Sequence, residues 1–320
     1  MRPGIENRYL GSLIGLAVGD ALAVAVDSKT PNDNSPVENM RGGGPWNLEP
    51  GQWTDKTSMA LCLAASIVER HGFDTKDQMD RYLRWRDEGY MSSTGHCLGI
   101  GETVTKSLHL YETTGKPDAD PTTGCTADDG SLVRLAPVPM YMVHDARRAK
   151  ELAAAMSKTT HEALEAVDCC RYMAGMMVGA FRGEAKDLLL SDLYSPVYNY
   201  WLLQHFALTS RVDNLARGIY KSKKAEDLSA SGCVVDTMEA ALWAFHQTDS
   251  FREGMLLVIN LGDGTGAAGA VYGQLAGAYY GAAEIPSEWT EVITDREFIE
   301  DLARKLMYET AQSIRHFANL

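Results

Sequence analysis

The sequence contains no Cys-x-x-Cys pair and no two histidines at the spacing that would place them on one helix face. The first absence argues against a zinc finger and a redox dithiol, and the second against a helical zinc site. The six cysteines follow no regular framework. We therefore expect free thiols in a reducing compartment, and a cytoplasmic protein.

Positive charge is also scarce, with 30 Lys and Arg against 43 Asp and Glu and a formal net charge of −13. This balance disfavours a nucleic acid or an anionic membrane as a partner, although a local basic site could still hold a small anion. The most apolar stretch, residues 9–27, has features of an export signal, but Glu6 precedes it and Asp20 interrupts it. We expect a buried helix there.

Strand-like alternation is missing too, since the nearest candidate, residues 132–142, contains two prolines. Apolar residues instead recur at helical spacing. The expected helices are 5–23, 57–71, 75–88, 99–112, 145–157, 161–181, 187–191, 195–208, 211–218, 234–246, 251–260, 266–281 and 297–317. No shift in composition marks a boundary, so we predict an all-α fold in which residues 1–320 form one compact domain.

Two of these helices carry small residues four positions apart, on a single face. They are Gly11, Gly15, Gly19 and Ala23 in the first helix, and Gly269, Gly273, Gly277 and Gly281 in the second. Glycine inside a helix costs about 0.5–1 kcal/mol relative to alanine. We expect close backbone packing to offset that cost, in buried helices rather than membrane spans.

Polar clusters stand at the starts of helices, next to two long loops. The loops, 27–53 and 113–130, exceed the usual length of a connection and are candidates for binding loops. Thr54-Asp55-Lys56 comes directly before the helix expected at 57–71, and Asp263 comes before the second glycine-striped helix.

Together these segments resemble the ADP-ribosylglycohydrolase family, of the type that reactivates ADP-ribosylated dinitrogenase reductase. The resemblance covers most of the chain and follows the family's order. The matching segments include GLAVGDAL, GGGPWNLEPGQWTD, YMSSTGHC, DGSLVRLAPVP, TTHEALEAVDCCRYMAG and NLGDGTGAAGAVYGQLAGAYYG. The resemblance implies an all-α fold with two Mg²⁺ or Mn²⁺ ions in a cleft, where they orient a ribose diol and a water that cleaves a glycosidic bond.

The chain departs from the family at the metal positions themselves. The first family cluster reads Thr-Asp-Asp, but here Lys56 stands at its third position. The second reads Asp-x-Asp-Thr, and the corresponding residues here are Gly264, Gly266 and Ala267, with Asp263 one position too early. A further acidic position near the ribose is Gly99 here. A two-metal site needs several carboxylates, so we predict no tightly bound metal pair and no cofactor.

Lys56 has three possible interpretations. Its ammonium could replace the missing cation, pair with Asp55 and donate to a ribose hydroxyl or a phosphate. It could be a neutral lesion in a decayed site. It could also lie on the exposed first turn of the helix, with Thr54 or Asp55 as the cap, although a lysine there opposes the helix dipole by about 0.3–1 kcal/mol.

Other residues are candidates for ligand contact. Asp129, Gly130 and Ser131 lie in a segment that resembles the family loop approaching ADP-ribose, with an aspartate where asparagine is commoner in the family. An ordinary Asp-Gly turn is the alternative. His161 could contact the ligand or could cap a helix. The predicted ligand-binding set is Thr54, Asp55, Lys56, Gly99, Asp129, Gly130, Ser131, His161, Asp263, Gly264 and Gly266.

Three functions remain open. The first is a binding module for ADP-ribose, a related nucleotide or an ADP-ribosylated protein, which has lost the metal-dependent hydrolysis. The second is a metal-independent enzyme with Asp55 or Asp20 as general base and Lys56 stabilising charge at the ribose. The third is a structural or protein-interaction scaffold. The losses concentrate at the metal positions while neighbouring motifs persist, which favours a binding role or a changed chemistry over random decay. We rank the binding module first, the metal-independent enzyme second and the scaffold third.

Overall fold

The computed structural model describes residues 3–27, 35–118, 127–203, 206–229, 232–262 and 265–318. Within these ranges the chain forms helices and no strand, and its β pairings are two isolated bridges, Gly43–Leu48 and Asp128–Cys233. The helices are α1 (Ile5–Asp27), α2 (Asp55–Arg70), α3 (Thr75–Glu88), α4 (Glu102–Thr114), α5 (Pro137–Tyr141), α6 (Ala146–Lys158), α7 (Leu164–Phe181), α8 (Lys186–Leu189), α9 (Ser210–Ala216), α10 (Val234–Gln247), α11 (Phe251–Ile259), α12 (Thr265–Tyr280), α13 (Ser287–Thr290) and α14 (Arg296–Ala318). The all-α prediction is confirmed.

Helices α1 and α12 run antiparallel at the centre and make the most extensive contact between any two elements. Their glycine stripes meet pairwise. A Cβ built on Gly11, Gly15 or Gly19 would lie 2.1–2.3 Å from a carbonyl oxygen of Gly277, Gly273 or Gly269, respectively. The predicted close packing is confirmed, because no side chain fits between the two backbones.

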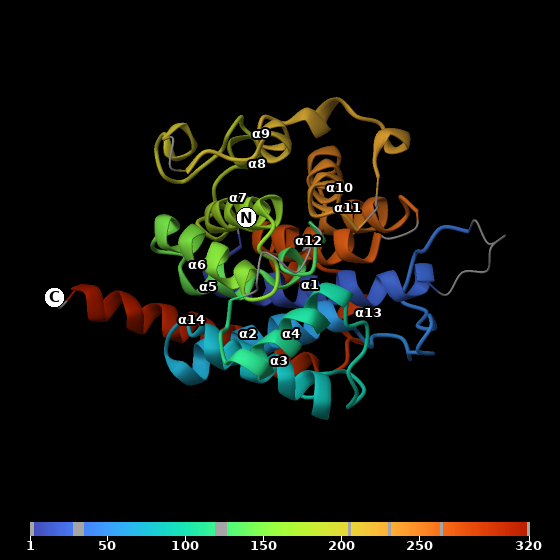
Figure 1. Cartoon of the computed structure of the whole chain (residues 1–320). Coiled ribbons are helices and arrows are strands. Elements are labelled where there is room, and N and C mark those ends of the chain that lie inside the picture. The colour runs from blue at the N-terminus through green and yellow to red at the C-terminus, as the bar shows by residue number, and fades with distance from the viewer. Residues whose placement is uncertain are drawn as a thin grey trace.

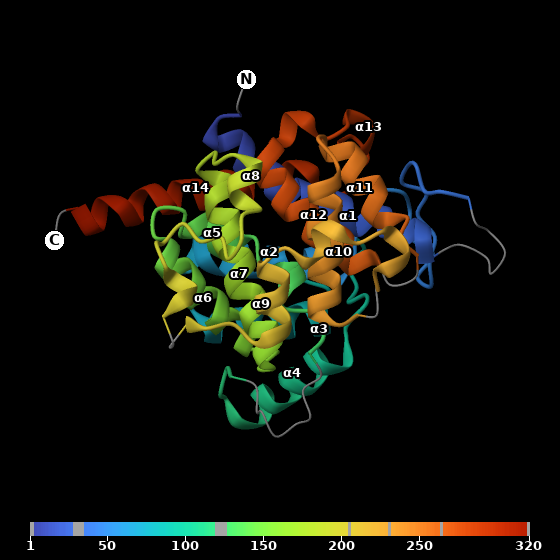
Figure 2. The same ribbon diagram turned by 90° about the horizontal axis from the view of Figure 1, so that it is seen from above.

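The other helices cover this central pair. Helices α10, α11 and α7 pack against α12, α14 packs along α1 and α2, and α6 lies on α7. Helices α3 and α4 lie on the outer side of α2 and enclose a second, smaller apolar cluster that includes Tyr82 and Trp85. Figures 1 and 2 show α8 and α9 on the opposite side of the molecule from α3, and the C-terminal end of α14 projecting from the body. No described helix has the length and apolarity to cross a membrane.

Some helix predictions differ from the structure. Helix α1 extends to Asp27 instead of ending at 23, α7 begins at Leu164 instead of 161, and the short helices α5 and α13 were not expected. Residues 195–208 form no long helix. Apart from residues 204–205, which are not described, they are irregular, with 3-10 conformation at Tyr200–Leu202 and at Phe206. Asn199 has a φ of 51°, which interrupts any helix, while Tyr200 and Trp201 anchor the segment by burial. The helix expected at 99–112 begins only at Glu102, because Gly99 has a φ of 75°.

Candidate ligand-binding site

A cavity of about 330 Å³ lies where α1, the N-terminus of α2 and the first turn of α12 meet. The loops before α2 and α4 and residues 128–130 complete its wall. The side chains that line it include the carboxylates of Asp20, Asp55, Asp128 and Asp129 and the ammonium group of Lys56. The volume is at the small end of the range for ligand pockets, and the lining is acidic.

Asp20 fixes the start of α2. Its buried carboxylate accepts hydrogen bonds from the backbone N–H groups of Thr54 (3.0 Å) and Thr57 (3.1 Å) and from the two hydroxyls, at 2.6 and 2.8 Å. The first turn of a helix leaves such N–H groups without an intrahelical acceptor, and a carboxylate there also favours the helix dipole. The prediction of Thr54 as the cap residue is confirmed in position, since Thr54 is the N-cap of α2, but its hydroxyl donates to Asp20 and makes no side-chain cap bond.

Lys56 points into the carboxylate cluster, and only 20% of its side chain is exposed. Its Nζ donates to Asp55 Oδ1 and to Thr54 Oγ1, both at 3.1 Å, and lies 3.7 Å from Asp20 Oδ1. Burial lowers the pKa of Lys56, but the carboxylates of Asp55 and Asp20 raise it more, so that the group stays charged. The interpretation of Lys56 as an exposed residue on the first helical turn is wrong.

Two glycines make room for this arrangement. A Cβ on Gly266 would lie 3.6 Å from Cε of Lys56 and 3.2 Å from Cβ of Ala23, so the lysine stem occupies space that a longer side chain at 266 would need. Gly99 has a φ of 75°, and a Cβ there would lie 2.6 Å from Asp55 Oδ1. An aspartate at position 99 would therefore be strained and would collide with Asp55.

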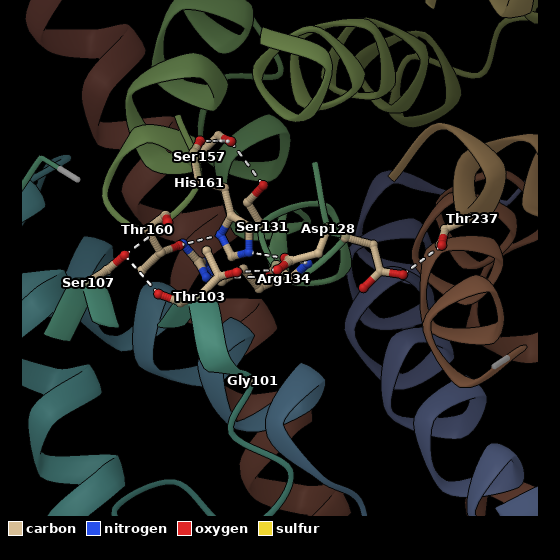
Figure 3. A network of polar contacts seen from close by, with 12 residues as sticks. Gly101, Thr103, Ser107, Asp128, Ser131, Arg134, Ser157, Thr160, His161 and Thr237 are labelled. Atoms are coloured by element: carbon tan, nitrogen blue, oxygen red, sulfur yellow. Dashed lines mark hydrogen bonds and ion pairs between the residues drawn. The ribbon is translucent and has the colours of Figure 1, made fainter. Parts of the chain in front are cut away.

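A buried relay holds the loop that carries Asp128 (Figure 3). Arg134 Nη2 donates to Thr160 Oγ1 at 2.6 Å, Thr160 Oγ1 lies 2.7 Å from His161 Nδ1, and His161 Nε2 bonds Asp128 Oδ1. Burial lowers the pKa of His161 despite Asp128, so the ring is neutral at pH 7. The network then fixes its proton on Nε2, facing Asp128. His161 lines the cavity, but both ring nitrogens are already engaged.

Gly130 lies at the cavity wall, whereas the neighbouring Ser131 lies in the core. The Gly130 N–H donates to Asp128 Oδ1 at 3.3 Å, and Gly130 itself lines the cavity. Ser131 is fully buried, and its hydroxyl accepts from Ser157 at 2.9 Å and lies 3.5 Å from Cys170 Sγ. Its side chain therefore belongs to the core. Asp263 and Gly264 lie outside the described residues.

Asp129 is held by Thr237, whose hydroxyl donates to Oδ2 of Asp129 at 2.6 Å. Burial raises the pKa of Asp129 to about 6, although Thr237 and Lys56 lower it. Asp128 shows the opposite shift. Burial would raise its pKa, but the bonds with His161 and Thr103 lower it to about 2.

These shifts predict opposite pH dependences for two neighbouring variants. The pKa of Asp129 lies above the usual value of an unfolded aspartate, about 3.9, so ionisation of Asp129 makes the fold less stable as the pH rises from about 4 to 6. Asp129→Asn cannot ionise, so its Tm relative to wild type should increase over that window. The ionised Asp128 stabilises the fold above pH 4, so Asp128→Asn should have a lower Tm than wild type there. This difference should shrink as the pH falls from about 4 towards 2 and the wild-type carboxylate becomes protonated. Parallel curves for the two variants in a thermal-melt series would contradict this assignment.

Several residues at or behind the cavity wall were not predicted from the sequence. Trp46 and Thr103 line the cavity. Thr57, Thr103 and Thr237 each donate a hydroxyl to one of the carboxylates. Thr57 directly follows the Thr54-Asp55-Lys56 cluster, and Trp46 follows three consecutive glycines and Pro45, which is a usable signal. Thr237 lies near the start of α10, and no motif in the surrounding sequence marks it as a site residue.

Comparison with known proteins identifies the relationship. Residues 1–315 match the family model described as ADP-ribosylglycohydrolase. The chain belongs to the ADP-ribosylglycohydrolase family. It is 35% identical over 302 residues to the ADP-ribosylarginine hydrolase of Serratia proteamaculans, covering 94% of this chain and 79% of the relative. It is 26% identical to the ADP-ribosyl-[dinitrogen reductase] glycohydrolase of Rhodospirillum rubrum, covering 90% of each.

A solved structure supports the same relationship. The chain is 38% identical to one titled "ADP-ribosylglycohydrolase-related protein complex", with a TM-score of 0.81, covering 96% of this chain and 99% of that one. Both the fold and the family of the ADP-ribosylglycohydrolases are thus established for this chain.

The metal pair that the resemblance to this family implies does not fit the residues described in this cavity. All four hydrogen bonds to Asp20 come from donors that a cation would have to displace, and the Lys56 ammonium lies against Asp55 and Asp20. Among the described residues, no three Asp, Glu, His or Cys side chains are grouped so that they could hold a metal ion. A divalent ion beside Lys56 would meet repulsion of about 2 kcal/mol in water and about 8 at an effective dielectric of 20, at a separation of about 4 Å.

Proposed function

We propose that this protein binds ADP-ribose or a related nucleotide, free or attached to a protein, in a site that works without the metal pair. One observation carries the proposal. The Lys56 ammonium lies within 3.1–3.7 Å of Asp55, Thr54 and Asp20, where it supplies a positive charge to the carboxylate cluster. In this position the ammonium acts as a fixed substitute for a bound cation and can present a donor to the ligand.

The mutual fit of the substituted positions supports a remodelled site rather than a decayed one. Gly266 leaves space for the Lys56 stem, and Gly99 leaves space for the Asp55 carboxylate that pairs with Lys56. Independent losses would not be expected to accommodate each other. The charge of the lining also indicates how a ligand lies. Carboxylates and threonine hydroxyls suit the hydroxyl donors of a ribose, whereas a diphosphate belongs nearer the cavity mouth.

The test is calorimetric titration of ADP-ribose into the protein, with EDTA and then with Mg²⁺. We expect the same affinity in both conditions. Lys56→Met should weaken binding about 10–100-fold, since a hydrogen bond from a charged donor contributes about 1.5–3 kcal/mol. Lys106→Met, which removes an exposed lysine paired with Glu102, is the matched control and should bind like wild type. Binding that requires Mg²⁺ would overturn the proposal.

A second candidate function is metal-independent cleavage of the glycosidic bond. It is favoured by Asp129, a cavity carboxylate whose pKa of about 6 suits proton transfer near neutral pH. Asp20 is a poor base by comparison, because four donors already occupy its oxygens. Chromatography of the protein incubated with NAD or ADP-ribosylarginine distinguishes the two functions. Product formed in EDTA and lost in Asp129→Asn supports the enzyme, and absence of both binding and product leaves a scaffold.

A further inference from the structure

Trp46 is far more exposed to solvent than the other tryptophans of the protein. The other five are at most 6% exposed, whereas Trp46 is 41% exposed and lies on the wall of the cavity. A large aromatic surface left in water is unfavourable. An aromatic ring held at the edge of a polar pocket is typical of a ligand contact.

A tight hairpin fixes this ring in place. Gly43 and Leu48 exchange two backbone hydrogen bonds, at 2.7 and 2.8 Å, and Trp46 lies in the turn between them. Gly42, Gly43 and Gly44 all have positive φ, which only glycine adopts at little cost. Leu48 is buried beneath the turn. The exposure of Trp46 therefore follows from a rigid backbone and not from a loose loop.

The ring lies beside the polar end of the cavity. Its Cη2 is 3.5 Å from the position of a Cβ on Gly99, and that same position lies 2.6 Å from Asp55 Oδ1. The indole and the Asp55–Lys56 pair therefore face the same small volume. A group that fills it must offer hydroxyl donors to Asp55 on one side and an apolar face to Trp46 on the other. A furanose ring has both.

We infer that Trp46 stacks on the ribose ring whose hydroxyls bond Asp55, and thereby sets the cavity's preference for a sugar over a base. This inference rests on the proposed function and adds to it a residue and a ligand part. The contact needs no metal and involves no covalent step. It also explains why the hairpin holds a tryptophan outward at this site.

Acrylamide quenching of tryptophan fluorescence tests the inference, because Trp46 is the tryptophan that the quencher can reach. Saturating ADP-ribose, or ribose 5-phosphate alone, should lower the quenching constant towards that of the Trp46→Phe protein. Trp46→Ala should weaken ADP-ribose binding about tenfold in calorimetry, and Trp46→Phe should restore most of it. Tyr308→Ala, which removes another exposed aromatic, on α14, should bind like wild type.

The outcomes separate this inference from the proposed function. ADP-ribose could bind without changing the quenching of Trp46, and Trp46→Ala could bind it with unchanged affinity. That result would overturn the stacking inference and leave the proposed function intact. Protection of Trp46 by adenine but not by ribose 5-phosphate also overturns the inference, since the base and not the ribose would then stack on the indole ring. Failure of ADP-ribose to bind wild-type protein at all overturns both.

Discussion

Replacing Asp20 by alanine should lower the free energy of unfolding by about 3 kcal/mol. The carboxylate is 1% exposed and accepts four hydrogen bonds, two of them from backbone N–H groups at the start of α2. Each donor left unsatisfied costs about 1–3 kcal/mol, and water entering from the cavity recovers part of that. The same change removes one counter-charge of Lys56. We therefore expect Asp20→Ala to disorder the site as well as destabilise the fold.

Urea unfolding followed by circular dichroism measures the effect. Asp145→Ala is the matched control, because Asp145 caps α6 with a single bond to the Arg148 N–H and its loss should cost about 1 kcal/mol. Equal losses in the two variants would show that Asp20 is an ordinary cap. An Asp20→Ala protein of normal stability that has lost only turnover would contradict this structural role and would make Asp20, rather than Asp129, the general base of a metal-independent enzyme.

Gly273→Ala should destabilise the protein by about 3 kcal/mol or more, although alanine favours helices. Helix propensity alone predicts a gain of about 0.5–1 kcal/mol. A Cβ on Gly273, however, would lie 2.0 Å from the Gly15 carbonyl oxygen and 2.5 Å from its carbonyl carbon. Neither backbone can move alone, so α1 and α12 must separate along their contact, and overpacking of this kind is costly.

The separation should also reach the cavity, because α1 carries Asp20 and α12 carries Gly266. Thermal unfolding measures the stability, and ADP-ribose titration of the folded variant measures the site. Gly4→Ala is the control, since a Cβ there has nothing within 4 Å. A Gly273→Ala protein as stable as wild type would mean that the two helices are less closely packed than described.

Much of the fold could be predicted from the sequence because, in most of the helices, apolar residues recur at helical spacing. Helices α3 and α11 bury one face each, whereas α2 and α10 are buried on every side over residues 57–67 and 237–245. For all four helices the expected bounds lie within two residues of the observed ends. The spacing gave a wrong prediction at residues 195–208, where Tyr200 and Trp201 are buried by anchoring an irregular segment. Apolar spacing cannot distinguish a helix face from isolated anchors. The assignment of residues 1–320 to one domain stays a prediction.

The site was predictable only in part. Short motifs placed Asp20, Asp55 and Lys56 together, because they resemble segments that are close in the family. Asp129 and Gly130 were found in the same way, and both line the cavity. Thr237 was missed, since its hydroxyl reaches Asp129 from a helix more than 100 residues away in sequence. Ser131 lies in the motif yet faces the core.

The sequence by itself determined the all-α class, the family and the close packing of the two glycine-striped helices, although only the structure showed that they pack against each other. These three features depend on the spacing of apolar residues and on the identity of individual residues, and both can be read from the sequence. Only the tertiary structure decided the direction of Lys56. An exposed lysine on a first helical turn and a lysine paired inside a cavity have the same local sequence. The neighbouring carboxylate of Asp20 and the space left by Gly266, both distant in the chain, make the inward position favourable.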